Sequence, residues 1–228
     1  MTNSTASAPS PATQPDWILV ADSLADIGRS FYDRGWALGT SGNFSAVLRS
    51  RPLQLAITGT GLDKGRLSRK GIVVVDESGK VVEGVGAPSA EVALHLAIAQ
   101  TVGAGAVFHT HSVWSTVLAE FNHSQGGISI KGYEMLKGLS GIRTHEHREW
   151  LPILENSQDC NELARTVTEE LGRNPQIHGF LLYRHGLYTW GADLEEAKRH
   201  VEILEFLLEV LGRSRAAKPD IAAAMTES

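Results

Sequence analysis

The sequence predicts a single mixed α/β domain, and three observations support this. Helical patterns, with apolar residues every three or four positions, alternate along the chain with short apolar runs typical of β-strands. The chain has 228 residues, 42% of them hydrophobic, which is enough for one sizeable core. No internal repeat or linker interrupts the middle of the chain. We therefore expect one domain over residues 16–212, between a flexible leader (1–15) and a flexible tail (213–228).

The first half of the chain is predicted to contain two helices and three strands. Asp16 can cap a helix whose apolar positions recur every three or four residues until Gly35 ends it. A second helix is predicted to open at Pro88–Ser89, and Gly103 ends it. Between the two helices, short apolar runs separated by loops predict strands at 44–48, 53–58 and 72–76.

The second half adds three strands and three helices. A short apolar strand at 106–108 leads into His109, and a helix follows through Glu120. The polar, Gly-rich segment 122–156 has no clear periodicity, and we assign it no element. Asp159 and Asp193 can each cap a helix, the last of which carries a long apolar stripe that ends before Gly212. Between these two helices, strands are predicted at 179–183 and 187–190.

Charge and composition exclude several classes of protein. The chain has 21 Lys and Arg against 26 Asp and Glu, a net charge of −5, so it lacks the broad basic surface of a nucleic-acid-binding protein. No apolar run approaches the ~20 residues that a membrane span needs. The single cysteine, Cys160, cannot form an internal disulfide, and residues 1–14 lack the features of a signal peptide. We therefore expect a cytoplasmic protein.

The pair His109 and His111 is the first indication of chemistry. The two residues stand two apart at the end of a predicted strand, so both side chains lie on the same face. Two imidazoles on one face can supply two corners of a zinc site, with a third ligand from elsewhere in the chain. Alone, this pattern is weak, because two polar surface histidines fit it as well.

Two further segments contain histidines that could belong to a metal site. His185 lies in a tight turn between two apolar strands, a position that can project inward from a rigid scaffold. Its simpler interpretation is an ordinary turn histidine. His145 and His147 form a second pair that competes with His109 and His111, but charged residues surround it, which favours a solvated loop. We therefore rank this pair second and take His185 as the partner of the first pair.

Three segments are candidates for binding an anion. Residues 39–43 (GTSGN) and 58–61 (TGTG) are Gly-rich loops, and Pro88–Ser89 stands at a predicted helix start. Backbone N–H groups in such loops and at helix N-termini bind anions, and Lys64 can add positive charge. Each segment alone is more typical of an ordinary turn, and no phosphate-loop or dinucleotide-binding motif is present.

Two glutamates could take part in chemistry beside a metal. Glu91 falls in the first turn of the predicted second helix, where a glutamate often does no more than interact with the helix dipole. Glu134 lies in the segment KGYEMLKG (131–138), outside any amphipathic pattern, and its simpler interpretation is a surface residue.

Taken together, these segments resemble the class II aldolase/adducin family over roughly residues 17–212. The order and spacing of the matching stretches are much more specific than any one of them. The resemblance implies a three-layer α/β/α fold with a central, largely antiparallel sheet. It also implies a homotetramer with active sites between neighbouring subunits, and one divalent metal ion per subunit, usually Zn²⁺. The matching stretches are SGNFS (41–45), ITGTG (57–61), PSAE (88–91), HTHS (109–112) and RHGLYTWG (184–191).

The resemblance also implies roles for individual residues. The zinc ligands would be His109, His111 and His185, with Glu91 beside the metal and sometimes a fourth ligand. The aldolases have two hydroxyl residues before this glutamate, whereas here Ala90 takes the second place. The residues that match the phosphate cradle are Gly42, Asn43, Thr60, Gly61 and Ser89.

Segments 104–112, 131–139 and 145–156 resemble one branch of the family in particular. This branch dehydrates 5-methylthio-D-ribulose 1-phosphate to 5-methylthio-2,3-dioxopentyl phosphate in methionine salvage. Its acid/base glutamate corresponds to Glu134, whose pKa we expect burial to raise. The resemblance thus implies a lyase with a small sugar-phosphate substrate and no nucleic-acid or membrane partner. Trp114 and Tyr133 are candidates for contacting the methylthio group, although plain packing explains them equally well.

Two alternatives stay open within the same family. A sugar-phosphate aldolase of the fuculose or rhamnulose 1-phosphate type would use the same zinc site to break a carbon–carbon bond. An adducin-like interaction module would have neither metal nor activity. The three candidate ligands and the lack of a long basic tail argue against the module. The sequence leaves open the identity of the metal, since imidazole ligands suit several divalent ions.

Overall fold

A sheet of nine strands organises the fold, and all but one of its strand pairings are antiparallel. In the computed structural model, which describes residues 16–217, the strand order is β4-β3-β2-β1-β5-β9-β8-β7-β6. Only β7 and β8 run parallel, so the predicted, largely antiparallel sheet is confirmed. The strands are β1 (Asn43–Ser50), β2 (Leu53–Thr58), β3 (Ile72–Asp76), β4 (Val81–Glu83), β5 (Ala106–Thr110), β6 (Gly127–Lys131), β7 (Arg148–Leu154), β8 (Gly179–Leu182) and β9 (Gly186–Gly191).

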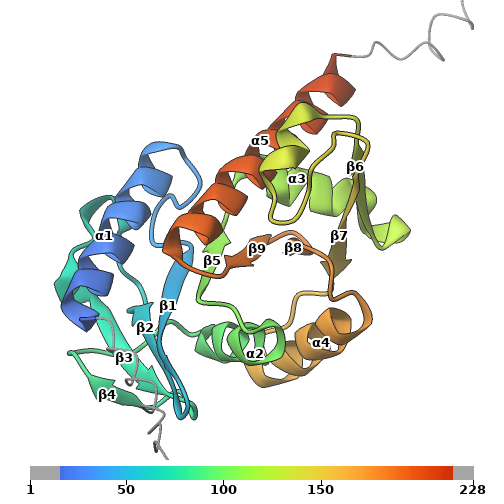
Figure 1. Ribbon diagram of the computed structural model, residues 1–228. Helices are drawn as coiled ribbons and strands as arrows, with labels where there is room; N and C mark the ends of the chain where they lie inside the picture. Colours follow the sequence, from blue (N-terminus) through green and yellow to red (C-terminus); the bar gives the residue numbers. More distant parts are fainter. Residues whose placement is uncertain (1–15, 218–228) are drawn as a thin grey trace, which may run out of the picture.

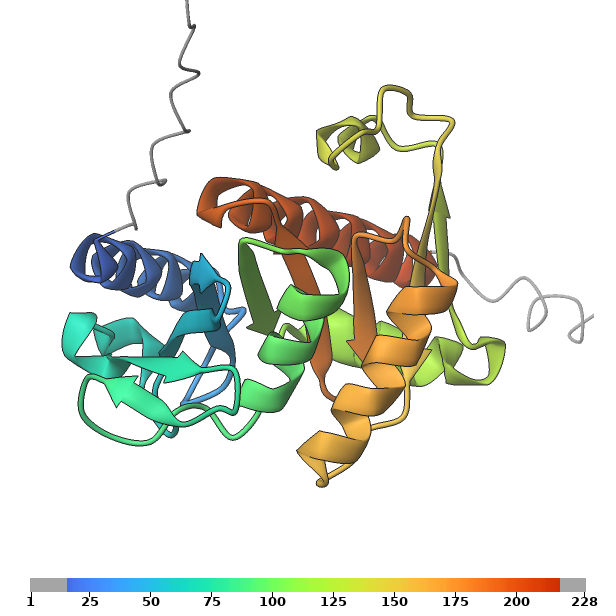
Figure 2. The same ribbon diagram turned by 60° about the horizontal axis from the view of Figure 1, so that its bottom comes forward.

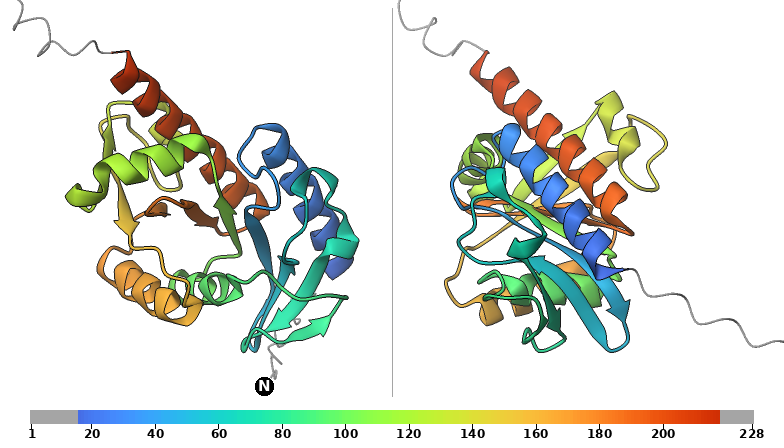
Figure 3. Two further views of the ribbon diagram at one scale, coloured as in Figure 1. Left: turned by 180° about the vertical axis from the view of Figure 1, so that it is seen from behind. Right: turned by 90° about the vertical axis from the view of Figure 1, so that its left-hand side faces the viewer.

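Helices cover both faces of the sheet and give three layers (Figures 1 and 2). On one face lie α1 (Trp17–Asp33), α3 (Val113–Asn122) and α5 (Leu194–Ala216), and on the other lie α2 (Val92–Val102) and α4 (Cys160–Arg173). Figure 3 shows α1 and α5 side by side. Across residues 16–217, no helix combines the length and apolar character that a bilayer crossing requires. The described residues also form four short 3₁₀ helices: η1 (Lys64–Arg66), η2 (Arg69–Gly71), η3 (His123–Gln125) and η4 (Glu134–Gly138).

Local capping chemistry explains where most helices begin. The side chains of Asp16, Asp159 and Asp193 each accept a hydrogen bond from a backbone N–H of the first turn, as predicted. Ser112 caps α3 in the same way. Gly103 ends α2 in the left-handed conformation (φ 69°), which glycine adopts without steric cost.

Two predicted helix boundaries are wrong, both because of contacts distant in sequence. Helix α2 begins at Val92 rather than at Pro88, since the Ser89 N–H donates to the Thr58 carbonyl at the end of β2 (3.0 Å). Helix α5 continues through Gly212, which packs so closely on Trp114 that a Cβ would lie 2.0 Å from the ring. Residues 213–216 are therefore helical, whereas residues 1–15 and 218–228 lie outside the described chain.

Segment 122–156, which the sequence left unassigned, contains two strands and the 3₁₀ helices η3 and η4. Strands β6 and β7 form the last hairpin of the sheet, and η4 lies in the connection between them. In Figure 2 this connection projects from the body of the domain. The sequence of β7 does not show a clear strand pattern, because Glu149, a charged residue, occupies a buried position in it (1% exposed).

Three phenylalanines form the core behind the site described below. Phe31 of α1, Phe44 of β1 and Phe108 of β5 meet in edge-on pairs, with ring centroids 5.5 to 5.8 Å apart. Phe44 and Phe108 are directly paired across the two strands, and Asn43 is paired with His109 in the next register position. The aromatic cluster therefore fixes the strand ends that carry the polar residues.

We expect Phe108→Ala to lower the free energy of unfolding by about 3–5 kcal/mol, because it leaves a cavity among fully buried rings. Urea denaturation measures this change. The control is Phe121→Ala on α3, whose ring is 72% exposed and whose loss should cost less than about 0.5 kcal/mol. Similar values for the two variants would contradict the assigned core.

Candidate metal centre

Three imidazole rings meet at the end of β5. His109 belongs to the strand, His111 follows it, and His185 lies in the turn between β8 and β9. The Nε2 atom of His109 is 2.8 Å from Nε2 of His111 and 3.3 Å from Nε2 of His185. One ligand atom from each ring lies within 4.8 Å of the others. The structure therefore brings together the three histidines that the sequence selected.

The chemistry of this donor set fits a metal ion. His109 donates from Nδ1 to the Leu187 carbonyl (2.9 Å), which leaves a lone pair on Nε2. Burial lowers the pKa of all three rings, that of His111 to about 2, so all are neutral at pH 7. Neutral ring nitrogens at these separations repel through their lone pairs, unless a proton or a cation lies between them. Three such imidazoles are a common ligand set for Zn²⁺.

A strained turn positions His185. Arg184, just before it, has φ 53°, in the left-handed region that non-glycine residues rarely occupy. Gly186, just after it, approaches β5 so closely that a Cβ would lie 2.0 Å from the Thr110 carbonyl oxygen. Thr116 of α3 also donates a hydrogen bond to the His185 carbonyl (3.1 Å). Contacts with β5 and α3 therefore hold the turn against the other two histidines.

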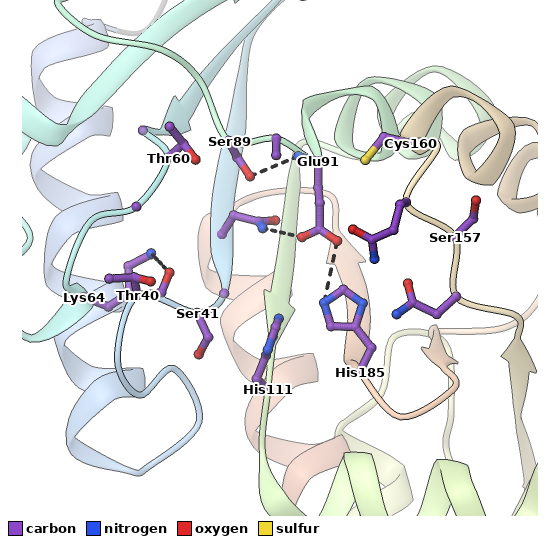
Figure 4. Close-up of a pocket in the computed structure, with 17 residues that line it drawn as sticks. Thr40, Ser41, Thr60, Lys64, Ser89, Glu91, His111, Ser157, Cys160 and His185 are labelled. Atoms are coloured by element: carbon purple, nitrogen blue, oxygen red, sulfur yellow. Dashed lines mark hydrogen bonds and ion pairs between the residues drawn. The ribbon is translucent and has the colours of Figure 1, made fainter.

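Glu91 completes the group of metal-binding candidates. One carboxylate oxygen lies 3.5 Å from Nε2 of His109, and the other lies 3.7 Å from Nε2 of His185. Asn43 donates from its side-chain amide to Glu91 (2.7 Å). The prediction that Glu91 sits in the first turn of a helix is wrong. It is the residue before α2, makes no capping hydrogen bond, and points toward the histidines (Figure 4).

The candidate anion-binding segments line a cavity of about 470 Å³ next to the histidines. Lys64 is almost fully buried in its wall and donates to the backbone carbonyls of Thr40 (3.2 Å) and Leu62 (2.8 Å). Burial lowers the pKa of Lys64 to about 8. All five predicted cradle residues, Gly42, Asn43, Thr60, Gly61 and Ser89, line this cavity together with Glu91, His111 and His185.

Different segments of the chain line the opposite sides of the cavity (Figure 4). Thr60 and Lys64 lie on one side, and Ser157 and Cys160 lie on the other, at the start of α4. Glu91, His111 and His185 lie between them.

Sequence reasoning missed two residues of the centre. Tyr188 of β9 is paired with His109 and stacks on its ring, with centroids 4.0 Å apart and planes 11° apart. His95 of α2 is fully buried behind Asn43, which it contacts through a hydrogen bond. His95 stands four residues after Glu91, one helical turn away, and that spacing was the available signal.

Comparison with known proteins agrees with this geometry. The sequence pattern of the "Class II Aldolase and Adducin N-terminal domain" family matches residues 22–211. The chain belongs to this family. Two relatives named methylthioribulose-1-phosphate dehydratase are similar to it. The one from Sorangium cellulosum is 42% identical over 83% of this chain and 90% of its own, and the one from Pseudomonas fluorescens is 40% identical over 86% and 94%.

Solved structures of the family share the fold. YgbL from Klebsiella pneumoniae superposes with a TM-score of 0.73 at 25% identity, covering 89% of this chain and 92% of its own. L-fuculose-1-phosphate aldolase from Thermus thermophilus gives a TM-score of 0.68 at 23% identity, covering 87% and 97%. At these identities the superpositions support the three-layer architecture.

Glu134 does not join the centre within its own chain. It lies on η4 with its side chain 72% exposed, contacts Lys137 and His145, and does not line the cavity. The hydrogen bond and charge of Lys137 lower its pKa, the opposite of the shift expected from burial. Neither Trp114 nor Tyr133 lines the cavity; both pack against the cluster around β6 and β7.

The connection that carries Glu134 is attached to the domain at Ser140. His178 contacts the Ser140 carbonyl (2.9 Å) through Nε2 and the buried Glu149 carboxylate (3.0 Å) through Nδ1. Both partners are acceptors, so both ring nitrogens of His178 carry a proton and the ring is charged. His200 accepts from the Ser140 N–H (3.1 Å). His147, of the second histidine pair, also contacts Glu149 (2.8 Å) and is not part of the metal centre.

These contacts predict that the stabilising contribution of His178 depends on pH. Burial of the His178 ring opposes its protonation, but the hydrogen bond and charge of Glu149 outweigh burial and raise its pKa. A raised pKa in the folded chain contributes stability in full below the unfolded value of about 6.5, and this contribution is lost as the pH rises through the folded value. We expect His178→Gln to lower the free energy of unfolding by about 1–3 kcal/mol at about pH 6, and by less at about pH 9.

Urea denaturation at the two pH values measures the difference. The control is His123→Gln, since His123 pairs with Glu155, whose side chain is 72% exposed, and should contribute less than about 1 kcal/mol. If His178→Gln lowers the free energy of unfolding equally at both pH values, the ring is neutral in the folded chain.

Proposed function

We propose that this chain is a zinc-dependent, cytoplasmic dehydratase that converts 5-methylthio-D-ribulose 1-phosphate to 5-methylthio-2,3-dioxopentyl phosphate and water in methionine salvage. The observation that carries the proposal is the cavity in which three neutral histidines and Glu91 adjoin a buried lysine and Gly-rich loops. Relatives at 40–42% identity over more than four fifths of the chain carry the name of this activity.

One side of the cavity suits the phosphate end of this substrate. The phosphate fits the side of Thr60 and Lys64, where a largely protonated ammonium adjoins loops with small side chains. Gly42, Gly61 and Ser89 complete this cradle. Asn43 contributes less than expected, because Glu91 and His95 occupy both ends of its amide. Anchoring the phosphate places the middle of the sugar chain beside the histidines.

The histidines would hold Zn²⁺ through their Nε2 atoms, with Glu91 beside it. When bound there, the ion would supply Lewis acidity for the C2 carbonyl, which would make the C3 proton removable. A carboxylate must then take the C3 proton, and an acid must protonate the C4 hydroxyl as it leaves as water. The resulting enol becomes the second ketone. Glu91 stands within reach of this chemistry, and Glu134 is the proposed acid/base group.

We propose that Glu134 reaches a centre through the association of chains. Within its own chain it is exposed and outside the cavity. We infer that it enters the cavity of a neighbouring subunit in a homotetramer. Burial there would raise its pKa from the low value that Lys137 imposes, as a proton donor requires.

The first test is turnover of methylthioribulose 1-phosphate by the purified, metal-analysed wild type and by a His109→Ala/His111→Ala variant. We expect diketone formation and about one zinc ion per chain in the wild type, and neither in the variant. Metal without dehydration would refute the substrate, and cleavage of fuculose or rhamnulose 1-phosphate would then identify an aldolase. Absence of any bound divalent metal would favour a non-catalytic module.

The second test mixes two inactive variants. Glu134→Gln should retain its zinc and lose turnover by about 10²–10⁴-fold, because one proton-transfer group is removed. When Glu134→Gln and His109→Ala/His111→Ala chains are unfolded and refolded together, mixed tetramers pair an intact histidine centre with an intact Glu134. Activity should therefore return. Activity in Glu134→Gln alone would remove this residue from the mechanism, and no recovery on mixing would place both groups in one chain.

A further inference from the structure

A chain of buried hydrogen bonds leads away from Glu91 into the core. Asn43 donates from its amide nitrogen to Glu91 (2.7 Å), and the amide oxygen contacts Nε2 of His95. The other ring nitrogen, Nδ1, is 2.7 Å from the hydroxyl of Ser45. His95 and Ser45 are fully buried, and Asn43 is 6% exposed. Four side chains from β1, α2 and the residue before α2 are thus connected in one line.

The direction of every proton in this line is determined. The Glu91 carboxylate only accepts, so Asn43 must present its NH₂ group to it and its oxygen to His95. His95 must then donate from Nε2, and its Nδ1 accepts from the Ser45 hydroxyl. Burial lowers the pKa of His95 to about 4, so the ring carries the single proton that this arrangement needs.

Without His95, the Asn43 amide would be held in the line by Glu91 alone. The amide oxygen would become a buried acceptor without a donor, which destabilises this arrangement. Rotation of the amide by 180° would turn this oxygen toward Glu91, where two acceptors repel. The main chain of Asn43 cannot move away, because it is paired with His109 in the sheet.

We propose that His95 is a positioning residue for the centre: by fixing the Asn43 amide, it directs the Glu91 carboxylate toward His109 and His185. It thereby sets the affinity of the site for a divalent metal and, as far as the proposed function holds, the turnover number. His95 itself touches neither the histidines' Nε2 atoms nor the cavity. It acts through Asn43 and Glu91.

The test compares three variants of the full-length protein. His95→Phe keeps a ring of similar size without hydrogen bonds, and His95→Gln restores a donor at the Nε2 position. Leu96→Ala, on the same helix, removes packing away from the line of hydrogen bonds. Zinc affinity is measured by competition with a chromophoric chelator, and kcat and KM are measured separately.

We expect His95→Phe to weaken zinc binding by about 10–100-fold, the usual effect of removing a group that orients a ligand. Under saturating zinc, kcat should fall while KM changes little. His95→Gln should recover most of both, and Leu96→Ala should change neither. Equal effects of His95→Phe and Leu96→Ala, or no recovery in His95→Gln, would reduce His95 to a packing residue and overturn the proposal.

A double-mutant cycle shows whether His95 acts through Glu91. In a Glu91→Ala background, His95→Phe should weaken zinc binding no further, because the carboxylate that it orients is gone. Additive losses would overturn the proposal. The zinc measurements need no substrate and therefore test this inference independently of the proposed function. A wild type that binds zinc but does not dehydrate the proposed substrate would refute the proposed function, and the zinc affinities of the variants would still decide the role of His95.

Discussion

The centre depends on the pairing of three adjacent strands at one position. Asn43 of β1, His109 of β5 and Tyr188 of β9 are direct neighbours across the sheet, so their side chains share one face. One residue along, Phe44 and Phe108 point to the opposite face and join the aromatic core beneath α1. A slip of one residue would exchange the two sets and bury the metal-binding candidates among phenylalanines. The apolar core thus determines which side of the sheet carries the chemistry.

Sequence reasoning succeeded where the signal is local. The two-residue spacing of His109 and His111 defines a common face in any strand, and Asp16 and Asp159 cap helices that begin next to them. It failed where distant contacts decide the structure. Ser89 stays outside α2 because its N–H donates a hydrogen bond to β2. The periodicity of apolar residues contains no information about such a contact.

The polar interior was the least predictable part of the molecule. Glu149 and His95 are hydrophilic by residue type, yet both are buried because other side chains satisfy their hydrogen bonds. Those partners come from separate elements, so no single segment displays the pattern. The exposed position of Glu134 agrees with its simpler interpretation as a surface residue, whereas the burial expected from its acid/base role is absent within its own chain.

The three histidines also connect regions of the chain that only the folded state brings together. His109 and His111 are close in sequence and stay near each other in any conformation, but His185 belongs to a turn much further along the chain. An unfolded chain therefore offers a divalent ion two neighbouring imidazoles, and the folded chain offers three. An ion bound by all three shifts the folding equilibrium toward the native state, by about 1.4 kcal/mol for each tenfold rise in free metal above the dissociation constant of the folded chain, until the metal concentration is high enough to load the unfolded chain as well. The supply of metal would then govern what fraction of the chains is folded as well as whether they react.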